Sequence, residues 1–202
     1  MKTPARIALC LAALMLSLAP LGCGGGGGGG DGPPPVVAGF VASGTPASAN
    51  LVRLAGRALD NDTVQVDVVL DGPTASSDIY SFAFDIELSN TSVARYVSGS
   101  AQFGNALELG PGQGSSVLVS QQGNRVVVGV SKTGGGPGNG FGAEQRIVVR
   151  MLFAVQAKGS TNLLFRGSSD PGNPTPDPAA LDSQGQVIPQ IVFDSAAAKI
   201  AG

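Results

Sequence analysis

The stretch Tyr80-Ser-Phe-Ala-Phe-Asp-Ile-Glu-Leu88 alternates apolar residues with small or charged ones along its whole length. Successive side chains of a β-strand point to opposite faces, so this period of two predicts a half-buried strand. Its apolar face would hold Tyr80, Phe82, Phe84, Ile86 and Leu88. Its polar face would hold Ser81, Ala83, Asp85 and Glu87. A row with so much apolar surface needs a second layer to cover it, which favours a β-sandwich.

The segment before this stretch repeats the same pattern. Gln65 and Asp67 would lie on its polar face, and Asp71-Gly72-Pro73 ends the run with residues typical of a turn. Its apolar face would hold Val64, Val66, Val68 and Leu70. The two segments therefore predict two strands of similar length with matching apolar faces.

Further segments have the composition of strands. They are residues 93–97, 117–121, 125–130, 147–155 and 162–165, followed by a last strand that ends at Phe193. Gln122-Gly123-Asn124 predicts a hairpin turn between two of them, and residues 171–178 predict a proline-rich loop. No segment has a helical period. About nine short strands predict an all-β fold, an antiparallel β-sandwich of the jelly-roll type.

The composition excludes several classes of function. The chain of 202 residues has no histidine, which removes the most frequent general base and most zinc sites. Its 12 lysines and arginines, against 14 aspartates and glutamates, leave no basic surface for nucleic acid. We therefore expect a protein that is not an enzyme and that has no cofactor and no nucleic-acid partner.

The first residues have the features of an export signal. Lys2 and Arg6 precede the apolar run 7–18, which has the length of a signal-peptide core and is too short to span a bilayer. Ala19-Pro20-Leu21-Gly22-Cys23 resembles the lipobox of bacterial lipoproteins. That resemblance implies removal of residues 1–22 and lipid attachment at Cys23. It also implies anchoring at the outer membrane, because Gly24 rather than aspartate follows the cysteine.

A flexible tether follows the lipobox. Residues 24–30 are all glycine, and Pro33-Pro34-Pro35 comes soon after. Polyglycine has no side chain to bury and loses more conformational freedom on ordering than any other sequence. The sequence therefore predicts three parts: a lipoprotein signal peptide over residues 1–22, a Gly/Pro-rich tether over 23–49 and one β-sandwich domain over 50–202.

Three motifs have a conceivable chemical role, and each has a simpler explanation. Residues 131–145 are glycine-rich but lack the spacing of a nucleotide-binding loop and precede a strand, which predicts an inter-strand loop. Asp60-Asn61-Asp62 with Asp67 offers carboxylates to calcium but lacks the alternating ligands of a calcium loop. Asp85 and Glu87 share a strand face without the cleft that a glycosidase pair needs. We expect no metal site and no catalytic residue.

The order of these segments resembles that of the cohesin domain. The resemblance extends over most of residues 50–195 and implies a jelly roll that binds a dockerin partner on one sheet face. The matching pieces are residues 64–70, 80–93, 123–131, 146–155 and 181–188. Carried over to this chain, the partner-binding positions are Ser81, Ala83, Asp85, Glu87, Gln121, Gln122 and Asn124.

The sequence thus leads to a functional hypothesis. It predicts a monomeric, non-catalytic, cohesin-like module, exported and lipid-anchored at the outer membrane or cell surface. Its partner would be a dockerin-like protein or a polysaccharide, in polysaccharide degradation or adhesion. Two alternatives stay open: a structural envelope lipoprotein without a specific ligand, and a direct carbohydrate-binding module. Because the chain has no tryptophan and Tyr80 belongs to the apolar row, Tyr96 is the remaining tyrosine for stacking on a sugar.

Overall fold

The computed structural model describes residues 35–72, 77–140, 144–167 and 178–202, which contain β-strands in two sheets and no helix. The predicted signal peptide, the lipid attachment at Cys23 and nearly all of the loop 171–178 lie outside the described residues. Within the described part, nothing forms a helix with the length and hydropathy required to cross a membrane. Residues 35–202 form one compact unit that holds all of these strands.

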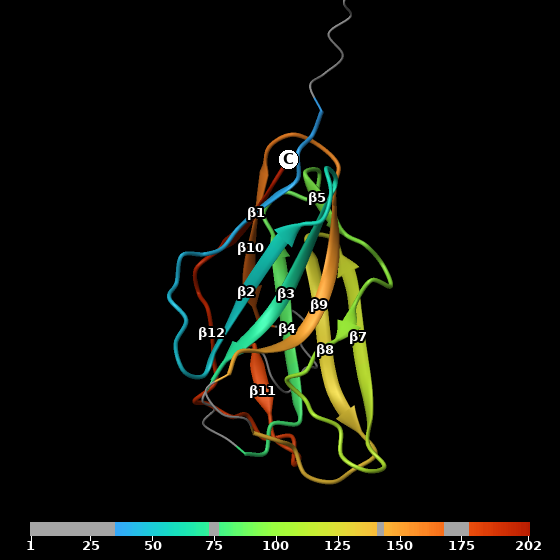
Figure 1. Ribbon diagram of the computed structural model, residues 1–202, viewed down its shortest axis with the longest axis vertical. Coiled ribbons are helices and arrows are strands. Elements are labelled where there is room, and N and C mark those ends of the chain that lie inside the picture. The colour runs from blue at the N-terminus through green and yellow to red at the C-terminus, as the bar shows by residue number, and fades with distance from the viewer. Residues whose placement is uncertain (1–34, 73–76, 141–143, 168–177) are drawn as a thin grey trace, which may run out of the picture. The chain divides into compact units, whose positions relative to one another are not determined.

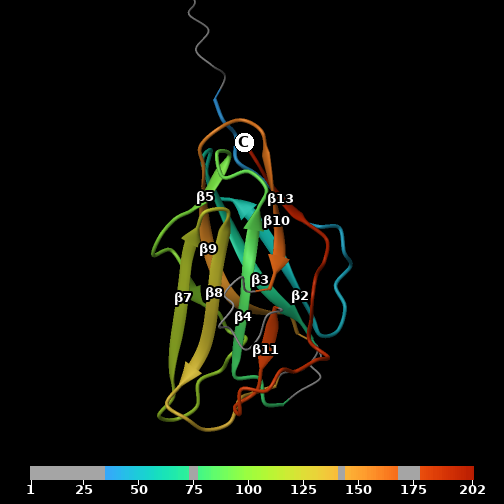
Figure 2. The ribbon, with the colours of Figure 1, turned by 180° about the vertical axis from the view of Figure 1, so that it is seen from behind.

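Sheet A contains seven strands, and all of its neighbouring strands pair antiparallel. In spatial order they are β1 (Gly39–Val41), β13 (Ala198–Ala201), β10 (Ser160–Arg166), β4 (Ser81–Leu88), β8 (Arg125–Thr133) and β7 (Gly114–Gln122), with β11 (Ala179–Leu181) beside the first residues of β4. Figure 2 shows β4, β8 and β7 side by side, with β7 at the margin of the sheet.

Sheet B contains six strands and covers the other side of the core (Figure 1). In spatial order they are β12 (Val192–Phe193), β2 (Leu51–Ala58), β3 (Thr63–Asp71), β9 (Arg146–Val155) and β5 (Ala94–Tyr96), with β6 (Gln102–Phe103) also beside β9. β12 pairs parallel with β2, and the other neighbours are antiparallel. The structure therefore confirms the predicted all-β sandwich.

The apolar row of β4 lies at the centre of the core. Phe82, Phe84, Ile86 and Leu88 are buried as predicted, and Tyr80 at the edge of the row is half-buried. Sheet B contributes the buried side chains of Val64, Val66, Val68 and Leu70 from β3. The rings of Phe84, Phe165 and Phe193 contact one another with centroids 5.2 to 5.6 Å apart. Burial of each large apolar side chain contributes about 1.5–3 kcal/mol, so this interior is the main source of stability.

The number of strands is larger than the predicted nine. β1, β6, β11 and β12 contain only two or three residues, too few for an alternating pattern to be recognised. β2 is longer but is interrupted by Gly56, and a Cβ at this position would lie 2.6 Å from the backbone oxygen of Gln65. These additional strands complete the sheets without changing the architecture.

The folded unit begins earlier than predicted. Residues 35–49 were assigned to the tether, yet β1 pairs with β13 from Gly39 to Val41, and the Ala38 amide donates a hydrogen bond of 2.8 Å to the Asn61 carbonyl. The hydroxyl of Ser43 donates to Asp194 at 2.5 Å. Because strand pairing and hydrogen bonds fix this segment, the domain starts at Pro35 rather than at residue 50.

Candidate functional site

The outer face of sheet A is the side of β10, β11, β4, β8 and β7 that points away from sheet B. Its β4 residues are those that alternate with the buried row of Phe82 and Phe84. The strand registers place its side chains in four rows. From one end to the other, the rows are Leu181, Ser81, Ser131 and Ser116; Ala179, Ala83, Gly129 and Leu118; Arg166, Asp85, Val127 and Ser120; and Leu164, Glu87, Arg125 and Gln122.

The second row, which we call the small-residue row, makes the middle of this face smooth. Ala179, Ala83 and Gly129 are paired across three strands and have no side chain larger than a methyl group. Ala179 is only 3% exposed, so Ala83 and Gly129 are the accessible part of these three. The row ends on β7 with Leu118, which is 72% exposed. Among the side chains of the four rows, Leu118 is the exposed large apolar one, and it extends the row of small residues with apolar area.

The charged end of the outer face consists of two ion pairs. Arg125 Nη1 lies 3.2 Å from Asp85 Oδ2, and Arg166 Nε lies 2.6 Å from Glu87 Oε2. The hydrogen bond from Arg166 is the main cause that lowers the pKa of Glu87 below its ordinary value. Each carboxylate therefore has a cationic partner, and the pair Asp85 and Glu87 forms part of a neutral network instead of an acid–base pair.

The structure places most of the predicted partner-binding residues on this face. Ser81, Ala83, Glu87 and Gln122 belong to its rows, and Asn124 in the adjoining turn donates to Glu87 Oε1 at 3.4 Å. Together with Leu118, which the sequence analysis missed, they are the accessible candidates.

Two of the predicted residues do not have the expected environment. Asp85 belongs to the face but is only 2% exposed, because Arg125 covers its carboxylate. Gln121 points to the opposite side, where its Oε1 accepts the Tyr96 amide at 2.9 Å and links β7 to β5. Neither side chain can be a principal contact for a partner.

The aspartates considered for calcium are not brought together. Asp60 Oδ1 accepts the backbone amide of Asp62 at 3.1 Å, and this hydrogen bond is the main cause that lowers the pKa of Asp60. Asp67 lies on β3, where Arg150 Nε is 2.9 Å from its Oδ1. Among the described residues, no group of three acidic, histidine or cysteine side chains is placed to hold a metal ion.

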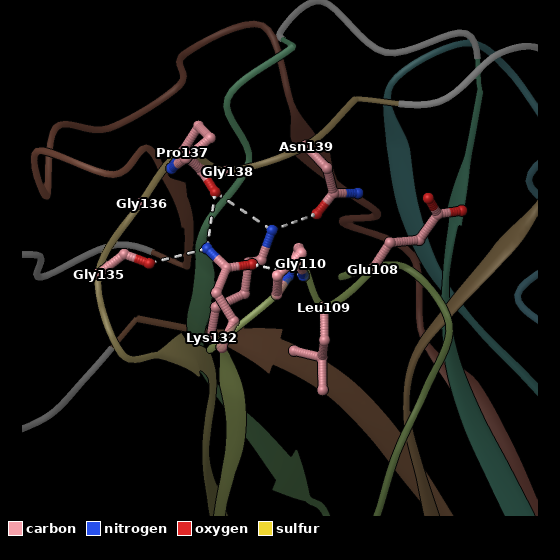
Figure 3. A pocket seen from close by; sticks show the side chains of 11 residues that line it. Glu108, Leu109, Gly110, Lys132, Gly135, Gly136, Pro137, Gly138 and Asn139 are labelled. Atoms are coloured by element: carbon pink, nitrogen blue, oxygen red, sulfur yellow. Dashed lines mark hydrogen bonds between the residues drawn. The ribbon is translucent and has the colours of Figure 1, made fainter.

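A pocket of about 340 Å³ lies at the end of β7 and β8, between the loops 108–113 and 134–139 (Figure 3). Lys132 crosses its base and is only 3% exposed. Its Nζ donates to the Pro137 carbonyl at 3.2 Å and to Asn139 Oδ1 at 3.4 Å. Gln113 joins the two loops, since its Nε2 donates to the Gly135 carbonyl at 2.9 Å.

These contacts give the pocket a structural role. Asp78 accepts hydrogen bonds from the Ser183 hydroxyl and the Gly138 amide, and these two bonds, the first being the stronger cause, lower its pKa. The donors at the pocket thus point at loop carbonyls and side chains of the chain itself. The described part of the glycine-rich segment, residues 134–140 and 144–145, lies between β8 and β9 as the sequence predicts, and Lys132 and Asp78 hold residues 137–139 in place.

No protein-family model matches the chain, and a search of curated proteins also finds no match. Solved structures do match. A type II cohesin, A11 from Bacteroides cellulosolvens, superposes with a TM-score of 0.51 and 12% identity over 72% of this chain and 95% of that one. A type II cohesin–X-dockerin complex from Acetivibrio cellulolyticus, an N-terminal interface mutant, gives a TM-score of 0.50 and 14% identity over 71% of this chain and 92% of that one. The chain therefore has a cohesin-like fold, which confirms the resemblance seen in its sequence.

Proposed function

We propose that this protein is a non-catalytic docking module that binds a dockerin-type protein on the outer face of sheet A. The observation that carries the proposal is the small-residue row, which ends in the exposed Leu118. A face of small side chains loses little conformational entropy when a partner covers it. The solved cohesin–X-dockerin complex of a protein with the same fold supports the choice of partner class.

The charged end of the face would orient the partner. Arg166 and Glu87 are each partly exposed and stand beside the smooth row. Charges at the rim of an interface contribute to the association rate and to specificity more than to affinity. We therefore assign apolar contact to the small-residue row and orientation to this ion pair.

A polysaccharide is the weaker choice of ligand. Sugar rings stack on exposed aromatic side chains, and the described rows of the outer face contain none. Tyr96, the remaining candidate from the sequence, is buried against Phe153 with ring centroids 6.1 Å apart. The binding test below therefore includes glycans as a second class of probe.

We also propose that the module is held at the surface of a bacterial cell by lipid on Cys23, with the glycine run after it as a spacer. This part rests on the sequence, where the only cysteines are Cys10 in the apolar run and Cys23 at the lipobox. A module so placed would keep polysaccharide-degrading or adhesive proteins close to the cell.

Titration calorimetry on the folded unit 35–202 tests the docking proposal. The probes are dockerin modules encoded in the same genome, with a glycan array in parallel. Gly129→Arg places a long side chain in the small-residue row and should weaken dockerin binding by at least about tenfold. Ala55→Arg, on the opposite face of the sandwich in sheet B, is the matched control and should bind normally.

Three results would overturn the docking proposal. They are glycan binding without dockerin binding, no binding to either probe, and equal binding by the two arginine variants.

The lipid proposal has its own test: the full chain expressed in a bacterium with labelled palmitate should incorporate label. Cys23→Ser should abolish the incorporation, whereas Cys10→Ser should not. Label retained by Cys23→Ser would refute it.

A further inference from the structure

The edges of the two sheets differ greatly in length. Among the described strands, β1 and β5 have three residues and β12 has two, whereas β7 has nine. Short edge strands are one device by which proteins prevent association through unpaired backbone groups. β7 has no such protection, because Gly-Ser-Ser-Val-Leu-Val-Ser-Gln-Gln contains neither a charge nor a proline.

The open backbone groups of β7 can be assigned to particular residues. The turn Gly123-Asn124 has two residues, so Gln122 and Arg125 form the hydrogen-bonded pair that closes the hairpin. Hydrogen-bonded and non-hydrogen-bonded pairs alternate from there along the hairpin. The backbone N–H and C=O groups of Ser120, Leu118 and Ser116 therefore point to β8. Val117 and Val119 therefore direct their N–H and C=O groups away from the sheet, and no described backbone group bonds to them.

The centre of β7 is a palindrome. Ser116-Val117-Leu118-Val119-Ser120 reads the same in both directions. Two antiparallel copies centred on Leu118 would pair each residue with its own kind: leucine with leucine, valine with valine and serine with serine. A two-fold axis at Leu118 pairs Val117 with Val119 and Ser116 with Ser120 in both directions, so the palindrome brings side chains of equal size and polarity together in one self-complementary patch.

We infer that the β7 edge binds the β7 edge of a second copy of this chain, in antiparallel register about Leu118. Val117 of each copy would exchange main-chain hydrogen bonds with Val119 of the other. Leu118 would then form a non-hydrogen-bonded pair with its counterpart, the arrangement in which opposite side chains lie closest. The pairing would cover an apolar side chain that is 72% exposed in the single chain.

This inference goes beyond the proposed function and does not depend on it. The symmetry axis of an antiparallel strand pair is perpendicular to the sheet, so the outer faces of both copies would lie on the same side of one continuous sheet. If those faces bind dockerin-type partners, a pair of copies would present two sites side by side and gain avidity.

The association is expected to be weak. Pairing of one edge strand buries less surface than the ~1,200–2,000 Å² of a standard interface. Sedimentation equilibrium of residues 35–202 should therefore be run from roughly 10 μM to 1 mM, the range where small interfaces associate. The weight-average mass should rise towards that of a dimer with increasing concentration.

Charge variants at the axis test the register. Leu118→Lys and Leu118→Glu each place two like charges opposite one another, so each alone should remain monomeric. An equimolar mixture should associate again, because lysine would then face glutamate. Leu59→Lys, which alters a different exposed apolar residue, in the turn before β3, is the control and should dimerise as the unmodified protein does.

Each other outcome contradicts the inference. A monomer throughout the concentration range refutes the edge pairing. A dimer that persists in Leu118→Lys uses another surface. Variants that dissociate but do not associate as a mixture refute the two-fold register about Leu118. None of these measurements contains a dockerin, so their failure is distinguishable from failure of the proposed function.

Discussion

Asp85 and Arg125 form an ion pair between the neighbouring strands β4 and β8, with Asp85 Oδ2 3.2 Å from Arg125 Nη1. The carboxylate is almost fully buried, whereas Arg125 is partly exposed and also donates to the Gly167 carbonyl at 2.9 Å. A buried acid of this kind depends on its partner, because a desolvated charge without compensation is strongly unfavourable. The pair therefore stabilises the sheet on which the proposed docking face is built.

The first prediction concerns the stability of this pair. Asp85→Ala should lower the free energy of unfolding by about 1–3 kcal/mol, because it removes a charged hydrogen bond and leaves Arg125 partly uncompensated. Glu87→Ala is the matched control two residues along the same strand face. Its pair with Arg166 is much more exposed, so the loss should stay below about 1 kcal/mol. Urea unfolding measures both, and equal losses would contradict the structural difference.

The second prediction concerns the packing of the N-terminal strand on the sandwich. A Cβ at residue 56 would lie 2.9 Å from the Phe40 ring and 2.6 Å from the Gln65 carbonyl. Gly56→Ala should therefore destabilise the domain by about 1–3 kcal/mol through overpacking. A Cβ at Gly129 meets only Leu118, at 3.9 Å. Gly129→Ala should be neutral or stabilising by up to about 1 kcal/mol, since it restricts the unfolded chain.

Thermal and urea unfolding of the two alanine variants measure this difference. Because both replace a glycine in a strand by the same residue, intrinsic propensity cancels in the comparison. If Gly56→Ala is as stable as Gly129→Ala, β1 does not pack on β2 as described, and the start of the domain at Pro35 loses its support.

The third prediction is the response of stability to acid. Asp194 is buried, which alone would raise its pKa, but hydrogen bonds from Ser43, Ala196 and Thr45 outweigh burial and lower the pKa below its ordinary value of 3.8. A depressed pKa in the folded state stabilises the protein above the unfolded-state pKa, and this contribution is lost as the pH falls through the folded-state value. Stability should thus decline below about pH 4.

Variants of the hydroxyl donors isolate the contribution of Asp194. Ser43→Ala with Thr45→Val should reduce stability at pH 7 and make the decline between pH 7 and pH 3 shallower. Ser120→Ala removes an exposed hydroxyl and should leave the profile unchanged. Between pH 6 and 8 the profile should be flat, because the chain has no histidine. An unchanged acid slope in the double variant would disprove the role of these donors.

How far the sequence predicts this fold depends on strand length. β3, β4, β8 and β9 were identified because each has three or more inward positions occupied by apolar residues. β1 could not be identified in this way, since its three residues are fixed by pairing with β13 at the other end of the chain. Pairing between the two ends of a domain is a tertiary effect that no local pattern records.

The candidate site was predicted less completely than the fold. In Ser116-Val117-Leu118-Val119-Ser120 three apolar residues are consecutive, so the sequence does not show which of them point inward. The register of Gln122 with Arg125 decides it, placing Leu118 outside and Gln121 inside. The burial of Asp85 escaped prediction for a similar reason, because its partner lies on another strand.

The last prediction concerns the buried amine of Lys132. Lys132→Met keeps the apolar stem but removes both hydrogen bonds that hold the Pro137 carbonyl and the Asn139 side chain. The loop is also held by Gln113, by Asp78 and by two backbone hydrogen bonds of 2.9 Å between Ile79 and Asn139. Amide protons of these two residues should exchange faster in the variant, because their protection depends on the local free energy of opening.

Hydrogen exchange followed by NMR distinguishes this local effect from general destabilisation. Amides in the centre of β4, such as Phe84, report global unfolding, and their protection should fall less than that of Asn139. Lys158→Met removes an exposed lysine and should change neither. If Asn139 keeps its protection in Lys132→Met, the loop is held without the amine.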